Sequence, residues 1–364
     1  MIPTILTVIG TRPQYIKFAA LLPHLDERLH IVLVDTGQHY STALSRDFIE
    51  EYGLPQPAHV LASGPLDGLP RLAHYLERLD TIIDDARPDA LLCFGDTDSA
   101  LAASLAAVKH GVPVMHVEAG ERSRCTDGSR VHPAASPEES NRVLIDHTAA
   151  LLLCATEQGR TQCLSEGCCG EAILTGDIMY DLYLRLQAGK VNDAAELRRL
   201  GIGKEGYYYA TLHRAVNTDD AGRFASLLET LAGLDAAVIL PLHPRSSERL
   251  RAYGLTAPQG ALRIIEPVSH ATSLALTRNA RCVLTDSGGL TREAYFCGVP
   301  SICLDDSTAW YELVENGWCS LTGADAHAIR AAVEAPRPTE HPAIFGDGHA
   351  AERIVRAMLE YIPC

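Results

Sequence analysis

The chain has 364 residues, of which 47% are hydrophobic and 21% charged, so it can bury a sizeable core and is long enough for two domains. Its 31 basic and 46 acidic residues give a formal net charge of −15, which argues against nucleic acid or an anionic membrane surface as a partner. The 11 cysteines include no CxxC pair, and no apolar run has the length of a membrane span or the form of a signal peptide, so we expect a cytoplasmic protein with free thiols.

In the first half of the chain, short apolar runs alternate with helical stretches. The expected strands are Thr4–Ile9, Leu29–Thr36, Ala90–Phe94 and Val112–His116, and the expected helices begin at Pro13 and near Tyr40 and cover Ser99–His110. This alternation predicts a mostly parallel sheet with helices on both faces. In such folds, ligands bind beyond the carboxyl ends of the strands.

Charged residues follow several of these strands at their carboxyl ends. Arg12 and Lys17 follow the first strand, where an arginine can bind an anion through two hydrogen bonds and a lysine can act as a point charge. Asp96 and Glu118 follow two later strands, and the pair Glu138-Glu139 begins a helical stretch. Several carboxylates in one cleft can shift each other's pKa values and so provide an acid and a base near neutral pH. The alternative is that the acids are helix caps and that the basic residues are solvated surface charges.

A second alternating block repeats the pattern in the other half of the chain. Its expected strands are Tyr207–Thr211, Ala237–Leu240, Leu262–Ile265, Arg281–Leu284 and Ser301–Leu304. His213 and Arg214 follow the first of these strands, and His243 and Arg245 follow the second. A histidine in such a place can move a proton or donate to a phosphate, and an arginine can bind the anion.

The fourth of these strands leads into Ser287-Gly288-Gly289 and then into a helical pattern that carries Glu293. Glycines let the backbone approach a ligand closely, and the N–H groups of a helix N-terminus favour an anion, most often a phosphate. An acidic residue nearby can accept hydrogen bonds from ribose or sugar hydroxyls. The plainer alternative is an ordinary connection in which the serine caps the helix.

Two doubly wound, Rossmann-like domains with a cleft between their facing strand ends account for this pattern. We expect an N-terminal domain over residues 1–180, which carries the carboxylates, and a nucleotide-binding domain over residues 181–347. The amphipathic helix expected at Ala350–Tyr361, within residues 348–364, can pack back onto the first domain.

A series of short motifs stands in a fixed order along the chain. They are GTRP at 10–13, TGQH at 36–39, GDT at 95–97, HVEAG at 116–120, PEESNR at 137–142, HR at 213–214, HPR at 243–245, TDSGG at 285–289 and the spaced W, E and VENGW of 310–318. Over nearly the whole chain this order resembles the signature of the UDP-N-acetylglucosamine 2-epimerase family. The resemblance implies an α/β fold of the glycosyltransferase-B type, a UDP-sugar substrate, a homodimer, and neither a metal nor another cofactor.

The resemblance also implies a mechanism. A base removes the proton at C2 of the sugar and UDP leaves from C1 to give a glycal; UDP then re-adds to give the opposite C2 configuration, or water adds in hydrolysing members. The catalytic residues implied are Asp96, Glu118, Glu138 and His213. The substrate-binding residues implied are Arg12, Lys17, Gln38, His39, Arg142, His213, Arg214, His243, Arg245, Ser287, Gly288, Gly289 and Glu293.

The chain departs from the family pattern at several positions. Gln14 stands where a glutamate is usual, Val216 replaces an acid and Thr291 replaces a glutamine. Residues 305–309 lack an arginine and a glutamate, and a loop is inserted at Arg124–Val131. The nucleotide end therefore matches better than the sugar end, so a different UDP-sugar is an alternative substrate. A glycosyltransferase of the same fold or a non-catalytic nucleotide-sugar binder would also fit the sequence pattern.

Overall fold

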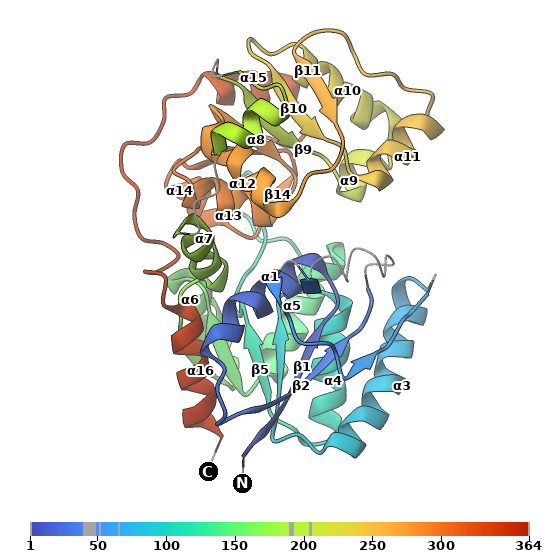
Figure 1. Ribbon diagram of the computed structural model, residues 1–364, viewed down its shortest axis with the longest axis vertical. Coiled ribbons are helices and arrows are strands. Elements are labelled where there is room, and N and C mark those ends of the chain that lie inside the picture. The colour runs from blue at the N-terminus through green and yellow to red at the C-terminus, as the bar shows by residue number, and fades with distance from the viewer. Residues whose placement is uncertain are drawn as a thin grey trace. The chain divides into compact units, whose positions relative to one another are not determined.

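The computed structural model describes residues 2–38, 49–50, 52–64, 66–188, 193–203 and 206–362. Its contacts divide the chain into two compact units. Unit 1 contains Met1–Arg122, His132–Arg185 and Ala343–Cys364, and unit 2 contains Ser123–Val131 and Leu186–Pro342. Each unit has a parallel sheet of its own with helices around it, so the predicted α/β class with two Rossmann-like domains is confirmed (Figure 1).

Unit 1 is built on a seven-stranded parallel sheet with the strand order β3-β2-β1-β4-β5-β7-β8. The strands are β1 (Thr4–Ile9), β2 (His30–Asp35), β3 (His59–Val60), β4 (Ala90–Phe94), β5 (Val114–Val117), β7 (Leu151–Cys154) and β8 (Glu171–Leu174). The helices are α1 (Arg12–Leu21), η1 (Leu22–His24), α3 (Gly68–Ala86), α4 (Asp98–Lys109), η2 (Pro133–Ala135), α5 (Pro137–Thr148), α6 (Glu157–Ser165), α7 (Ile178–Ala188, which runs on into unit 2) and α16 (Ala350–Tyr361). β2 and β3 lie on one side of β1, and β4 lies on the other side. The direction in which successive strands are added to the sheet therefore reverses between β1 and β4.

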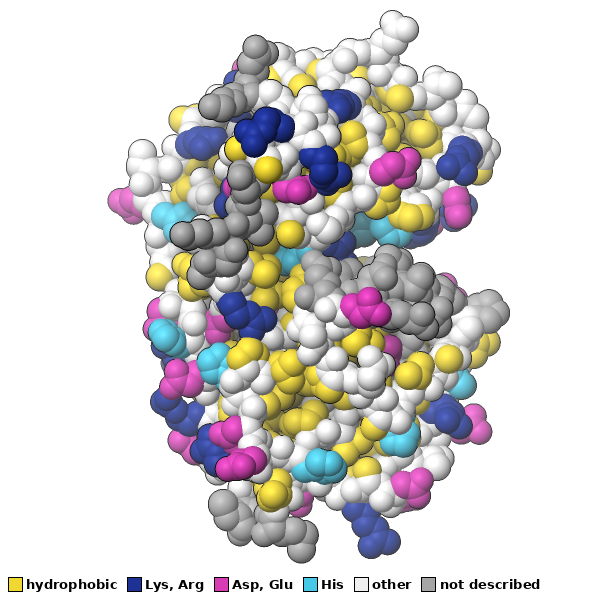
Figure 2. All heavy atoms as spheres, in the orientation of Figure 1, with side chains coloured by type: hydrophobic (Ala, Val, Ile, Leu, Met, Phe, Trp, Pro, Cys, Tyr) yellow, Lys and Arg dark blue, Asp and Glu magenta, His cyan; other side chains and the backbone are white. Residues whose placement is uncertain are grey.

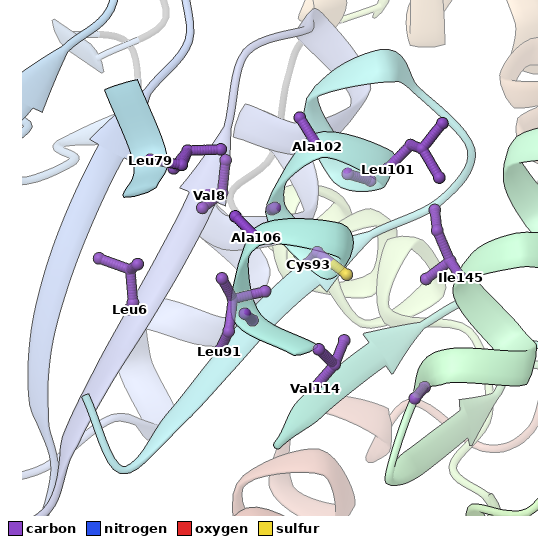
Figure 3. Close-up of a cluster of buried hydrophobic side chains, with 14 of the residues drawn as sticks. Leu6, Val8, Leu79, Leu91, Cys93, Leu101, Ala102, Ala106, Val114 and Ile145 are labelled. Carbon is purple, nitrogen blue, oxygen red and sulfur yellow. The ribbon is translucent and has the colours of Figure 1, made fainter. Parts of the chain in front are cut away.

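The main core of unit 1 lies between the sheet and the helices on one of its faces. Leu6 and Val8 of β1 and Leu91 and Cys93 of β4 are fully buried there with Leu79 of α3 (Figure 3). Their two-residue spacing places them on the same face of the sheet. The intervening residues of both strands are buried as well, as expected for a parallel sheet that is covered on both faces.

The C-terminal helix α16 belongs to unit 1 and packs against α1; the two are red and blue in Figure 1. Its buried Ile354 and Met358 lie one turn apart on its apolar face. The backbone N–H groups of Ala350 and Ala351 donate to the Asp181 carboxylate of α7, at 3.1 and 2.7 Å. This carboxylate therefore satisfies donors that have no acceptor within the helix.

Unit 2 has a six-stranded parallel sheet with the strand order β11-β10-β9-β12-β13-β15. The strands are β9 (Tyr208–Thr211), β10 (Val238–Pro241), β11 (Leu262–Ile265), β12 (Cys282–Thr285), β13 (Ser301–Cys303) and β15 (Cys319–Leu321). The helices are α8 (Asp193–Arg199), α9 (Ala215–Thr218), α10 (Ala221–Ala232), α11 (Pro244–Ala252), α12 (His270–Asn279), α13 (Gly288–Phe296), α14 (Tyr311–Glu315) and α15 (Ala326–Glu334). The winding of this sheet reverses between β9 and β12.

Helices cover both faces of the unit 2 sheet. Tyr208 of β9 belongs to a core cluster with Phe224 of α10 and Ile329 of α15. The next residue, Tyr209, belongs to a separate cluster with Leu276 of α12 and Leu290 of α13. Successive residues of one strand thus serve two cores, one on each face, which is the arrangement of a doubly wound sheet.

The inserted loop, Arg124–Val131, lies within the segment Ser123–Val131 that groups with unit 2 by its contacts, although the predicted boundaries place it inside the N-terminal domain. Its strand β6 (Arg124–Cys125) pairs antiparallel with β14 (Ser307–Thr308). The Arg124 guanidinium also lies over the ring of Tyr311, 5.8 Å from its centre. A strand of two residues leaves no periodic pattern in the sequence, so this pairing could not be predicted from the loop itself.

Some strands differ from the sequence expectations. Besides β6 and β14, the structure adds β3, β7, β8 and β15. β3, β8 and β15 are edge strands with partly or fully exposed residues, so their apolar patterns are weak. β7 is a buried apolar run of four residues that the expected strands leave out. The expected strand Val112–His116 is observed as Val114–Val117, and the start of the helix expected near Tyr40 lies outside the described residues.

Basic and acidic side chains are interspersed over both units on the face drawn in Figure 2. On that face an anionic ligand must therefore depend on local groups and not on a broad basic surface. Among the helices of the described residues, none has the length and the apolar composition needed to cross a membrane.

Candidate active site

Four of the residues singled out in the sequence lie at the carboxyl ends of the strands beside the two reversals of winding. In unit 1, Arg12 follows β1 and Asp96 follows β4. In unit 2, His213 follows β9 and Ser287 follows β12. Neighbouring connections diverge to opposite faces of a sheet at such a point, which leaves room for a ligand. Each unit thus carries its own candidate half-site.

Lys17 and Glu118 form a buried ion pair in unit 1. Lys17 comes from α1 and Glu118 from the turn after β5, and their side chains are 5% and 9% exposed. Gly95, at the end of β4, leaves room for the pair, because a Cβ atom there would lie 3.2 Å from both Lys17 Nζ and Glu118 Oε2. Glu118 itself has a left-handed φ of +71°, a conformation that costs a non-glycine residue about 1–2 kcal/mol. The fold holds this carboxylate against a lysine despite the strain, as is common at functional sites.

Arg142 of α5 bridges two carboxylates, those of Asp96 and Glu139. The Glu139 side chain is 1% exposed, whereas that of Asp96 is 28% exposed. Burial disfavours the charge of Arg142, but the neighbouring carboxylates outweigh this effect and raise its pKa. Asn141 Nδ2 donates to the Asp96 carbonyl oxygen at 2.9 Å and so fixes the turn after β4. Asp96 is therefore a firmly positioned carboxylate that a ligand can still reach.

The two adjacent glutamates at the start of α5 have different environments. Glu138 is exposed, and its Oε2 accepts a hydrogen bond from Ser136 Oγ at 2.7 Å. Glu139 is buried and pairs with Arg142. Neighbouring helix positions point about 100° apart around the axis, so only one of the two can enter the cluster. The predicted catalytic Glu138 thus lies at the rim of the half-site, and its role stays a prediction.

Gln14 explains one departure from the family pattern. Its Oε1 accepts from the Thr11 N–H at 3.1 Å, and its Nε2 donates to the Phe94 carbonyl oxygen and to Thr97 Oγ1, both at 2.9 Å. An ionised glutamate could accept a hydrogen bond from the Thr97 hydroxyl, but it has no proton to donate to the Phe94 carbonyl oxygen. The buried amide ties the turn after β1 to the turn after β4, which carries Asp96.

The other unit 1 residues of the predicted site lie near the same strand ends. Arg12 is exposed at the start of α1. Gln38 Oε1 accepts from Ser99 Oγ at 2.6 Å and from the Ser99 N–H at 3.2 Å, so the glutamine caps the beginning of α4. His39 lies outside the described residues.

In unit 2, Asp286 orients His213. The Asp286 side chain is fully buried, its Oδ1 lies 2.9 Å from His213 Nδ1, and its Oδ2 accepts from the backbone N–H groups of His213 and Arg214 at 2.9 and 3.0 Å. Burial alone would raise the pKa of the Asp286 carboxyl, but the His213 charge and these donors hold it below its usual value. An ionised carboxylate at Nδ1 leaves Nε2 of the partly exposed imidazole for a ligand.

The remaining charged residues of the predicted unit 2 site have protein partners. Arg214 NH1 lies 2.6 Å from Asp305 Oδ2, and Arg245 NH2 lies 2.7 Å from Asp219 Oδ2. His243 Nδ1 accepts from the Arg245 N–H at 3.3 Å, and the His243 ring centre lies 6.4 Å from that of His213. Asp305 stands in the stretch that lacks the family's arginine, and here it pairs with Arg214.

The Ser287-Gly288-Gly289 turn forms the N-terminus of α13, as predicted. Ser287 Oγ accepts from the Leu290 N–H at 3.4 Å and caps the helix. A Cβ atom at Gly288 would lie 3.2 Å from Trp310 Nε1, so glycine leaves space for this indole. Glu293 is buried, and its Oε1 lies 2.7 Å from His270 Nε2, so its predicted contact with ribose or sugar stays a prediction.

The sequence analysis did not single out Asp286 as a site residue, although it lies inside a quoted motif, and it grouped Glu139 with Glu138 without predicting which of the two is buried. Asp286 directly precedes Ser287, and Glu139 directly follows Glu138. An acid between a buried strand and a glycine turn could have indicated an orienting carboxylate. Nothing in the local pattern distinguishes the buried glutamate from the exposed one.

One group of side chains among the described residues has the spacing of metal ligands: His147, Glu166 and Cys168. Glu166 is already held by Arg122, whose Nε and NH2 lie 3.1 and 2.6 Å from its two carboxylate oxygens. Burial also raises the pKa of the Cys168 thiol to about 12. We therefore assign no metal here, and the metal-free mechanism stays a prediction.

The profile of the UDP-N-acetylglucosamine 2-epimerase family matches residues 24–359, nearly the whole chain. The chain belongs to this family. A UDP-N-acetylglucosamine 2-epimerase homolog of Methanococcus maripaludis is 32% identical in an alignment of 360 residues that covers 97% of this chain and 99% of the relative. The UDP-2,3-diacetamido-2,3-dideoxy-D-glucuronate 2-epimerase of Pseudomonas aeruginosa is 34% identical in an alignment of 371 residues, gaps included, that covers 96% of this chain and 98% of that enzyme.

Solved structures of epimerases agree with this assignment. The crystal structure of Methanocaldococcus jannaschii UDP-GlcNAc 2-epimerase, in complex with UDP-GlcNAc and UDP, matches with a TM-score of 0.88 at 32% identity and covers 98% of this chain and 99% of that one. The fold is therefore of the glycosyltransferase-B type, and the protein is a nucleotide-sugar 2-epimerase, an isomerase.

Proposed function

We propose that the enzyme epimerises UDP-GlcNAc, or a closely related UDP-linked N-acetylhexosamine, at C2 of the sugar. The observation that carries the proposal is the pair of half-sites: positioned carboxylates at the strand ends of unit 1, and a helix N-terminus with an oriented histidine in unit 2. Carboxylates can move a C2 proton, and the helix N-terminus can bind a diphosphate. The Methanocaldococcus relative, which binds UDP-GlcNAc and UDP, gives further support.

In the proposed reaction, a carboxylate takes the proton from C2, the electron pair of that bond forms the C1=C2 double bond, and the C1–O bond breaks as UDP leaves. UDP then re-adds at C1 while a carboxylic acid delivers a proton to C2 from the other face. In the hydrolysing alternative, water adds and the free 2-epimeric sugar leaves. Two faces of one carbon require two differently placed proton carriers, which a set of several carboxylates can provide.

We assign these proton transfers to Asp96, Glu118 and Glu138. Lys17 stabilises the ionised form of Glu118, which suits a base. Asp96 is positioned by Arg142 and remains partly exposed, and the exposed Glu138 can move toward a ligand.

The nucleotide part of the substrate is assigned to the groups that can bind a diphosphate. Ser287, Gly288 and Gly289 offer backbone N–H groups and a hydroxyl at the start of α13, and His213 offers Nε2. Arg12 is exposed and can add a guanidinium. Lys17 was predicted to bind UDP as well, but its contact with Glu118 supports a role at the carboxylate.

Solvent exchange at C2 tests the function directly. We expect incubation with UDP-GlcNAc in deuterated water to incorporate deuterium at C2 and to produce the 2-epimer, as followed by NMR. UDP-2,3-diacetamido-2,3-dideoxy-D-glucuronate belongs in the same panel because the Pseudomonas relative acts on it. If no UDP-sugar in the panel shows deuterium, glycal or epimer, the proposal is wrong.

The same experiment distinguishes this reaction from its competitors. Free 2-epimeric sugar together with free UDP would indicate the hydrolysing reaction. Transfer to an added acceptor without C2 exchange would indicate a glycosyltransferase. Tight binding of a UDP-sugar without any product would indicate a nucleotide-sugar binder.

A homodimer and a cytoplasmic location are further parts of the proposal. Both follow from the family resemblance and from the composition of the chain. Sedimentation of the purified full chain at several concentrations tests the dimer, and fractionation of the cells that make it tests the location.

Binding of UDP can be separated from catalysis by substitution. Arg12→Ala and Ser287→Ala should each weaken UDP binding about 10- to 100-fold, because each removes a donor to a charged diphosphate worth about 1.5–3 kcal/mol. Calorimetric titration with UDP measures the effect. Ser287→Gly tests the hydroxyl with less disturbance of the helix, since glycine is nearly as good an N-cap.

Arg28→Ala is a matched control, because Arg28 pairs with Asp26 before β2, at the opposite ends of the strands. Unchanged binding in both site variants would remove Arg12 and Ser287 from the nucleotide site.

A further inference from the structure

His116, in β5 of unit 1, is fully buried and has a hydrogen-bond partner at each ring nitrogen. Its Nδ1 lies 2.7 Å from Asp146 Oδ1, and its Nε2 lies 2.8 Å from the carbonyl oxygen of Gly95. A carbonyl oxygen can only accept a hydrogen bond, so Nε2 carries a proton. The state of the ring then depends on whether Asp146 also acts as an acceptor.

Asp146 is placed to be ionised. Its Oδ2 accepts from Arg122 NH1 at 2.7 Å and from the Gly120 N–H at 3.0 Å. The guanidinium of Arg122 is always charged, so its contact with Oδ2 favours the ionised form of the Asp146 carboxyl. An ionised carboxylate accepts at Oδ1, so Nδ1 of His116 carries a proton as well.

We propose that His116 is held as a doubly protonated imidazolium and that, with Asp146, it positions the two turns that carry Asp96 and Glu118. Gly95 directly precedes Asp96 and is the residue whose missing Cβ makes room for the Lys17–Glu118 pair. At the other end of the network, Gly120 comes two residues after Glu118. One ion pair thus holds the carbonyl of one turn and the N–H of the other.

The charges around the ion pair balance. His116 and Arg122 are the cations, and Asp146 and Glu166 are the anions, with Glu166 bound to the far side of Arg122. The thiols of Cys93, Cys163 and Cys168 also lie near Asp146. Burial raises the pKa of Cys93 and Cys168, and a hydrogen bond with Cys154 together with burial raises that of Cys163, so the three thiols stay neutral. At the exposed end of the network, His147 Nε2 lies 3.9 Å from Glu166 Oε2. A buried charged network with every member paired can hold a fixed geometry, whereas removal of one member leaves a buried charge behind.

The role in positioning rests on the proposed function, but the protonation of His116 can be measured without it. In the full chain labelled with ¹⁵N-histidine, we expect both His116 nitrogens to give the shifts of protonated nitrogens at neutral pH, because each of them faces an acceptor. Loss of the signal in His116→Gln assigns it. A neutral tautomer of His116 at this pH would overturn the proposal, whether or not the enzyme epimerises anything.

The positioning role is tested by His116→Gln and Asp146→Asn. Both should lower kcat for C2 exchange at least tenfold, leave UDP affinity unchanged, and speed hydrogen exchange of the Gly120 N–H, while His30→Gln, at the exposed amino end of β2, changes none of these. Asp146→Asn should also convert His116 to a neutral ring in the NMR spectrum. If folded variants keep the parent kcat, or if the Gly120 N–H remains protected, His116 does not position these turns. Should the parent itself show no C2 exchange, the proposed function fails, and the two NMR measurements still decide the state of the network.

Discussion

Glu118→Gln is expected to lower the rate of C2 proton exchange by about 10²–10⁴-fold, the usual contribution of a general acid or base. Glutamine keeps the shape of the side chain and can hydrogen-bond, but it cannot take a proton. UDP binding should be almost unchanged, because the nucleotide contacts are assigned elsewhere. The C2 exchange assay in deuterated water and calorimetry with UDP measure the two quantities separately.

This substitution also disturbs stability, and the two effects must be separated. Lys17 is 5% exposed, and removal of the Glu118 charge leaves its ammonium buried beside a neutral amide. Breaking a buried ion pair on one side costs about 3–5 kcal/mol. The double variant Lys17→Met/Glu118→Gln removes both charges, so it should recover much of the stability while C2 exchange remains lost.

The pattern of these variants decides the role of Glu118. If the double variant is stable and inactive, loss of activity does not follow from unfolding. If Glu118→Gln is folded and exchanges the C2 proton at the parent rate, Glu118 is structural, and the proton transfers belong to Asp96, Glu138, Glu139 or His213.

The parts of the molecule with strong local patterns could be predicted from the sequence. Buried strands followed by glycine turns, such as β12 with Ser287-Gly288-Gly289, combine a hydrophobic run with a residue type that the turn needs. The same signal placed Arg12, Asp96 and His213 at strand ends. It could not show which strands are neighbours, and therefore could not show that these ends flank a reversal of winding.

Features that depend on contacts between residues far apart in the chain could not be predicted from the sequence. The pairing of β6 with β14 joins residues that are far apart in the chain, and two-residue strands have no periodicity. The contact of His116 with Asp146 spans 30 positions and turns an ordinary strand histidine into part of a charged network. Whether Glu138 or Glu139 is buried depends on how α5 is rotated against the sheet, which is settled by packing and not by the identity of the residue.

Arg142→Met is expected to lower the free energy of unfolding of unit 1 by about 3–5 kcal/mol, because it takes the cation from beside a buried carboxylate. The Glu139 side chain is 1% exposed, so water cannot hydrate its carboxylate once the Arg142 guanidinium is removed. The Asp96 side chain is partly exposed, so its carboxylate can be hydrated. The matched double variant Glu139→Gln/Arg142→Met removes the buried charge too, so it should regain most of the loss. Arg28→Met, which breaks an exposed pair in the same unit, should leave the unfolding transition unchanged.

The positions of the tryptophans allow the two units to be followed separately. The chain has 2 tryptophans, Trp310 and Trp318, and both belong to unit 2. In a urea titration, tryptophan fluorescence therefore reports on unit 2, and hydrogen exchange of the β4 and β5 amides reports on unit 1. We expect Arg142→Met to lower the urea midpoint of the β4 and β5 amides and to leave the midpoint read by fluorescence in place. Equal shifts of both signals would mean that the two units unfold together, and no shift in β4 and β5 would mean that the bridge from Arg142 to Glu139 does not stabilise unit 1.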